Sequence, residues 1–143
     1  MEKSVFSKRN LTAFTVLHIC LVIIFYSKDS LAHGVDKKGP HGGFIQMPGA
    51  FHTELVPQEN GAFDVYLIDG NFKNPTVKDS SIEVTLKVQN NDKRVECISE
   101  GDRFICKMPE GKNMKERAKI FIKAVRAKNS RGIAIYNLPL KLQ

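Results

Sequence analysis

The sequence contains no tryptophan, only three cysteines and only one long apolar run. Three cysteines are too few for a disulfide-dense scaffold, and one apolar run excludes a membrane protein with several spanning helices. Hydrophobic residues make up 42% of the chain and charged residues 26%, which excludes a disordered or collagen-like chain. With 143 residues, the chain has room for one domain of ordinary size.

The chain is basic, with 22 Lys and Arg residues, 15 Asp and Glu residues and a formal net charge of +7. A positive balance can attract anions. The basic residues are nevertheless scattered over every segment of the sequence and form no single stripe. We therefore expect solvated surface charge, and we expect no nucleic acid as a partner.

The first 32 residues have the order of regions found in a secretory signal peptide. Residues 1–10 are basic, residues 11–26 are almost wholly apolar, and residues 30–32 supply small side chains before a cleavage site. A spanning helix needs about 20 apolar residues, whereas this run has 16 with polar interruptions. The sequence predicts cleavage after Ala32, no stable membrane insertion afterwards, and a periplasmic or secreted protein. A single membrane anchor is the alternative.

The predicted mature chain, residues 33–143, has the pattern of an all-β domain. Its strand-like runs alternate apolar and polar residues or are rich in β-branched residues. Residues 115–128 could form a helix by composition, but their β-branched and aromatic content favours a strand. About seven short strands predict an immunoglobulin-like β-sandwich, preceded by a His/Gly-rich segment over residues 33–50. The runs cover residues 51–56, 62–69, 82–88, 94–99, 103–108, 118–127 and 133–140.

Cys97 and Cys106 stand on either side of a predicted hairpin turn. A two-residue loop at Gly101-Asp102 would place the two cysteines opposite each other as a non-hydrogen-bonded pair. The Cα atoms of such a pair lie about 4.5 Å apart, which is within the disulfide range of roughly 4.4–6.8 Å. We expect a structural disulfide that faces the core. A thiol pair holding a soft metal such as Cu(I) is the alternative.

The three histidines of the predicted mature chain, His33, His41 and His52, all fall within its first twenty residues. Short histidine-biased tracts are associated with metal binding. On a strand, His52 and Glu54 project from one face, and an imidazole beside a carboxylate suits Zn²⁺ or another divalent metal. Two glycines follow His41, and their conformational freedom would let the loop fold a third donor over that strand.

Asp69 is a further candidate for this site. A tight hairpin at Asn60-Gly61 would place Asp69 opposite His52, where it would be a fourth ligand or would orient one. Taken singly, these side chains have ordinary explanations, such as a mobile terminus for His33 or a solvated hydrogen-bonded pair for His52 and Glu54. We interpret the set as a metal site composed of His41, His52, Glu54, His33 and Asp69.

Residues 41–43, 51–56, 65–69 and Asn74-Pro75 together resemble a known type of domain. They are similar to small periplasmic metal-binding β-domains that occur alone or fused to adaptor proteins of cobalt–zinc–cadmium and copper–silver efflux systems. The resemblance implies a location outside the inner membrane of a Gram-negative bacterium, with His41, His52 and Glu54 near the metal. The chain lacks the helical hairpin and lipoyl-like segment of the fused members, so it would not itself be an adaptor.

The leading hypothesis is an exported, non-enzymatic buffer or chaperone for a divalent or copper ion, with an envelope efflux transporter as its partner. A second hypothesis is a metal-free immunoglobulin-like interaction module of the cell envelope. A third is a copper enzyme in which the ring and α-amino group of His33 chelate copper, which requires cleavage after Ala32. No serine, cysteine or carboxylate arrangement in the sequence indicates hydrolytic catalysis.

Overall fold

A computed structural model describes residues 38–89 and 91–142, and these residues form eight β-strands and no helix. This part of the chain therefore has no helix that could cross a membrane. The prediction of an all-β chain is confirmed, although about seven strands were predicted. The predicted signal peptide and His33 lie outside the described residues. The strands are β1 (Phe44–Gln46), β2 (His52–Pro57), β3 (Ala62–Ile68), β4 (Ser81–Val88), β5 (Asn91–Glu100), β6 (Arg103–Lys107), β7 (Ala118–Arg126) and β8 (Ser130–Leu138).

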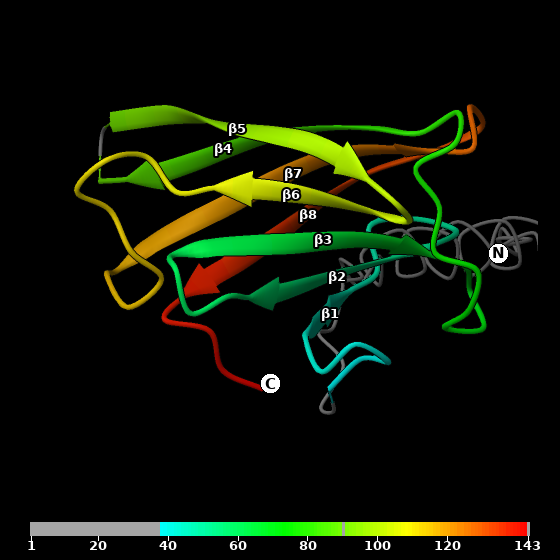
Figure 1. Ribbon diagram of the computed structural model, residues 1–143, viewed down its shortest axis with the longest axis horizontal. Coiled ribbons are helices and arrows are strands. Elements are labelled where there is room, and N and C mark those ends of the chain that lie inside the picture. Colours follow the sequence, from blue (N-terminus) through cyan, green and yellow to red (C-terminus); the bar gives the residue numbers. More distant parts are fainter. Residues whose placement is uncertain (1–37, 90, 143) are drawn as a thin grey trace, which may run out of the picture. The chain divides into compact units, whose positions relative to one another are not determined.

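The strands form one antiparallel sheet in the order β1-β2-β3-β6-β5-β4-β7-β8. The first half of β5 pairs with β4 and its second half pairs with β6, so β5 joins two halves of the sheet. We call β1-β2-β3-β6 the first half-sheet and β4-β7-β8 the second half-sheet. In Figure 1, β7 and β8 of the second half-sheet run behind β6 and β3 of the first.

The two outer edges of the sheet also meet, so the sheet is nearly closed. The hydroxyl of Tyr136 on β8 donates a hydrogen bond to the Thr53 carbonyl oxygen on β2 at 2.9 Å and lies 2.7 Å from Thr53 Oγ1. Burial raises the pKa of Tyr136 far above its ordinary value, which keeps this phenol protonated as a donor. Nearby, Gly132 on β8 packs directly against the backbone of Pro48.

The core fills the space between the two half-sheets, because alternate residues of each strand point inward. The seven residues that the predicted register placed on one inward face all belong to this core or pack against it. These residues are Val84, Leu86, Val95, Cys97, Phe104, Cys106 and Met108.

The β5–β6 hairpin has the predicted register. Cys97 lies directly opposite Cys106, their Cα atoms are 4.1 Å apart, and a disulfide joins them. Gly101 occupies the turn with a φ of +61°, a conformation that glycine adopts without steric cost. The prediction of this disulfide is therefore confirmed.

The β2–β3 hairpin differs from the prediction by one residue, because Ile68 and not Asp69 lies opposite His52. The connecting loop has three residues, 59–61, instead of the predicted two. Gly61 N donates to the Gln58 carbonyl oxygen, and Gly61 itself has a φ of +79°. This is a type I turn followed by a left-handed glycine, a loop that carries the same Asn-Gly signal as a two-residue turn.

We expect the double variant Cys97→Ala/Cys106→Ala to lose about 2–3 kcal/mol in free energy of unfolding, because the disulfide restricts a short loop of the unfolded chain. Urea unfolding followed by circular dichroism measures this loss. Wild-type protein under reducing conditions should shift to the same midpoint as the variant. Equal stability of the variant and the oxidised wild type would contradict the structural role of the disulfide.

Candidate functional site

The predicted site residues of β2 lie on the outer face of the first half-sheet, which points away from the main core. A second, smaller apolar cluster of Ile45, Tyr66 and Ile68 covers this face. Glu54 has no solvent exposure and His52 is only 5% exposed, although both lie outside the main core. These two side chains are therefore enclosed by the second cluster and by the loops that cover it.

The carboxylate of Glu54 holds the loop of residues 39–43 in place. Its Oε1 accepts hydrogen bonds from the backbone N–H groups of His41 at 2.9 Å and Gly43 at 2.8 Å. Its Oε2 lies 2.7 Å from Nδ1 of His41. Two backbone N–H groups and Nδ1 of His41 thus surround the buried carboxylate, an arrangement that satisfies its oxygens when Nδ1 is the donor.

The glycines of this loop allow it to approach β2 closely. A Cβ atom on Gly39 would lie 2.5 Å from Cδ of Glu54 and 2.5 Å from Cδ1 of Ile45. A Cβ atom on Gly43 would lie 2.6 Å from the Leu55 carbonyl oxygen. Larger residues would therefore lift the loop away from Glu54. The loop does fold His41 back over β2, where its ring stacks on Tyr66 with centroids 3.7 Å apart and planes 1° from parallel.

His52 is held by the loop that follows β3. Its Nδ1 lies 3.0 Å from the backbone carbonyl oxygen of Asp69. A carbonyl oxygen only accepts hydrogen bonds, so Nδ1 of His52 is the donor and carries the proton. The ring stacks on Phe72 with centroids 4.2 Å apart and planes 22° from parallel.

The side chain of Asp69 shapes this same loop. Its Oδ1 accepts hydrogen bonds from the backbone N–H groups of Asn71 and Lys73, and its Oδ2 accepts one from Nδ2 of Asn74. The bond from Lys73 and the other two lower the pKa of Asp69 below its ordinary value. The turn carries Phe72 at a φ of 61°, which is unusual for a bulky residue and needs such fixation. Asp69 therefore positions His52 and Phe72 and directs its carboxylate into its own loop.

The structure thus brings His41 and Glu54 together and places His52 beside the Asp69 backbone, while His33 lies outside the described residues. In residues 38–89 and 91–142, no three His, Cys, Asp or Glu side chains gather closely enough to hold a metal on their own. Both rings use Nδ1 for their hydrogen bonds, which leaves Nε2 of each histidine as the available donor atom.

Sequence reasoning missed the two aromatic residues that fix the histidine rings. The alternation of β3 places Tyr66 and Ile68 on the same face, so Tyr66 was within reach of a strand-pattern argument. Phe72 was not, because its position depends on an irregular loop. Comparisons with protein-family models, curated proteins and solved structures give no match for this chain. Its function is therefore inferred from these contacts.

We expect Gly39→Ala to lower the free energy of unfolding by about 1–3 kcal/mol, because the new methyl group overlaps Glu54 and Ile45. The His41 ring protons should also lose the upfield NMR shift that stacking on Tyr66 causes. Gly70→Ala is the matched control, since a Cβ atom there meets nothing within 4 Å, and it should change stability by less than about 0.5 kcal/mol. Equal effects of the two substitutions would contradict the close approach at Gly39.

We expect Asp69→Asn to destabilise the protein at neutral pH more than at acidic pH. The folded-state pKa of Asp69 lies below its ordinary value of 3.8, so its carboxylate stabilises the fold fully above that value. This contribution is lost as the pH falls from 3.8 through the lower folded-state pKa. Urea unfolding of both proteins between pH 7 and pH 2 measures the difference, with Glu59→Gln as a control for charge. A difference that stays constant with pH would contradict the assignment.

Proposed function

We propose that the protein is an exported metal-binding protein that holds a divalent or copper ion through Nε2 of His41 and Nε2 of His52. The observation that carries this proposal is that both rings have Nδ1 fixed by an acceptor, the Glu54 carboxylate in one case and the Asp69 carbonyl in the other. Histidines that bind metals almost always donate their second ring N–H to a carboxylate or a backbone carbonyl.

The placement of the two rings supports a common site. Glu54 pairs with Tyr66 and His52 pairs with Ile68 in the β2–β3 ladder, so the two stacked histidines cover neighbouring positions of one face. Neutral imidazole nitrogens suit Zn²⁺ and copper ions. His33, from the segment that precedes the described residues, is the proposed third donor.

In this proposal Glu54 and Asp69 orient ligands and do not bind the metal. Both oxygens of Glu54 already accept hydrogen bonds, as do both side-chain oxygens of Asp69. A carboxylate that accepts a hydrogen bond from a metal-binding imidazole fixes the tautomer of the imidazole and raises the basicity of its other nitrogen. The expected ligand set therefore reduces to histidines, with the Glu54 carboxylate and the Asp69 carbonyl oxygen as their hydrogen-bond acceptors.

The proposed fold family is immunoglobulin-like, and the strand order supports it. If β2 to β8 are lettered A to G, the pairs A-B, B-E and E-D form one connected set of strands and the pairs C-F and F-G form another. An immunoglobulin constant-type domain has the same ABED and CFG sets. The lettered strand D is β5, which also pairs with strand C.

The proposed location is the periplasm or the cell exterior, and the proposed role is a buffer or chaperone. The Cys97–Cys106 disulfide is typical of an oxidising compartment, and the signal-like N-terminal sequence supports export. The resemblance to the metal-binding β-domains of heavy-metal efflux systems supports an envelope efflux transporter as the partner that would receive the ion.

Isothermal titration of protein exported with its own leader tests the metal site, with Zn²⁺, Ni²⁺, Cu²⁺ and Cu⁺ as titrants. We expect saturable binding of one of these ions and its loss in His41→Ala/His52→Ala. Glu54→Gln should weaken binding by about 10–100-fold, because the carboxylate only orients His41. Glu83→Gln removes a carboxylate from β4 of the second half-sheet and should bind as wild type does. Unchanged binding in the double histidine variant would refute the proposal.

A further inference from the structure

The outer face of the second half-sheet carries a pair of like charges. The strand registers place Lys87 on β4 directly opposite Lys119 on β7, and Lys119 opposite Asn137 on β8. Like charges directly opposite each other destabilise a sheet. Lys123 lies four residues after Lys119 on β7, on the same face of the sheet. It lies opposite Glu83 on β4 and forms an ion pair with it at 3.5 Å. The face therefore has a complementary pair at one position and two facing lysines at the other, of which Lys87 alone has a carboxylate partner among the described residues.

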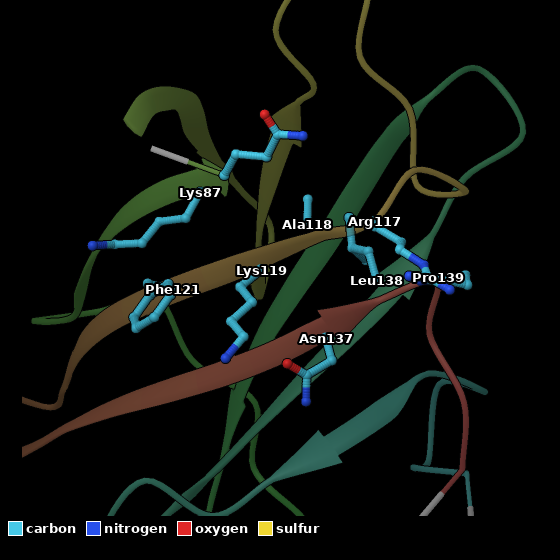
Figure 2. A pocket seen from close by; sticks show the side chains of 9 residues that line it. Lys87, Arg117, Ala118, Lys119, Phe121, Asn137, Leu138 and Pro139 are labelled. Atoms are coloured by element: carbon cyan, nitrogen blue, oxygen red, sulfur yellow. The ribbon is translucent and has the colours of Figure 1, made fainter. Parts of the chain in front are cut away.

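A pocket of ≈ 620 Å³ opens at this cation pair (Figure 2). Its volume lies within the range of roughly 300–1,000 Å³ that is typical of small-molecule sites. Lys87, Lys119 and Arg117 supply positive charge, and Asn137 supplies an amide. The remaining lining is largely apolar and includes the ring of Phe121, Leu138 and Pro139.

The cations of this pocket differ in how they are held. Lys87 Nζ is fixed, because it pairs with Asp92 at 3.0 Å and lies 4.9 Å from the centroid of the Phe121 ring. Within the described residues, Lys119 and Arg117 form no ion pair with any carboxylate. Lys119 lies on β7 and Arg117 immediately precedes this strand, and both side chains line the pocket. A negative charge bound there would meet two cations that no carboxylate of the described residues neutralises.

We propose that this pocket binds a small organic anion in which a carboxylate or phosphate is attached to a flat apolar group. The anionic group would lie between Lys119 and Arg117, where it offsets the repulsion between Lys87 and Lys119. The apolar group would pack on the ring of Phe121, and the Asn137 amide would supply a directed hydrogen bond. This site was not apparent from the sequence, because Lys87 and Lys119 are brought together only by the pairing of β4 with β7.

NMR titration of the full chain in the presence of a chelator tests this proposal and keeps it separate from the metal site. The probes are 2-naphthoate, naphthyl phosphate, the neutral 2-naphthalenemethanol and inorganic phosphate. We expect the amide signals of Lys119, Phe121 and Asn137 to shift saturably with one or both aromatic anions. Whichever aromatic anion binds tighter identifies the preferred anionic group. The neutral alcohol and inorganic phosphate should each bind at least about tenfold more weakly.

The variant Arg117→Gln/Lys119→Gln should weaken binding of the aromatic anions at least about tenfold. Lys123→Gln is the matched control, because it removes a cation from the same strand and face outside this pocket, and it should bind as wild type does. Wild-type affinity in the double variant would overturn the proposal. Equally tight binding of the neutral alcohol would overturn the role of the cations, and equally tight binding of inorganic phosphate would overturn the role of the apolar wall.

Discussion

The buried carboxylate of Glu54 is the constraint on which the first half-sheet depends. A charge without solvent contact is costly unless hydrogen-bond donors replace the lost water, and all three donors come from residues 41 and 43. Because β1 begins at Phe44, the loop that satisfies Glu54 also delivers β1 to the edge of β2, with Ile45 opposite Glu54. One carboxylate thereby fixes the loop, the edge strand and the ring of His41.

Local patterns in the sequence predicted the strands and the cysteine pairing. Polar–apolar alternation and turn residues determine strands and hairpin register through residues that are close together in the chain. The same reasoning failed at the β2–β3 hairpin, where Asn60-Gly61 fits both a two-residue loop and a type I turn with a left-handed glycine. The choice between these loops moves Asp69 by one position, so Ile68 takes the strand position opposite His52 and Asp69 contacts His52 through its backbone carbonyl oxygen. β1 was not predicted, because its three residues are too few to show the polar–apolar alternation of a strand.

The sequence predicted the candidate site only where glycines indicated that the backbone could bend. Glycines at 42 and 43 indicated that the chain could fold His41 over β2, and it does. The loop after β3 gave no such indication, because its left-handed conformation at Phe72 occurs in a bulky residue that rarely adopts it. The Asp69 carboxylate stabilises that turn through three hydrogen bonds, a role visible only once the loop has closed.

The two proposed sites have opposite electrostatic needs, and the fold separates them. A metal cation bound at His41 and His52 would be repelled by a nearby cluster of lysines, whereas an anion requires that cluster. The histidines lie on the outer face of the first half-sheet, and Lys87 and Lys119 lie on the outer face of the second. Packed sheets are about 10 Å apart, and charges at physiological salt are screened beyond about 8 Å. The outer face of the first half-sheet can therefore bind a cation, and that of the second can bind an anion, without either charge weakening the binding of the other.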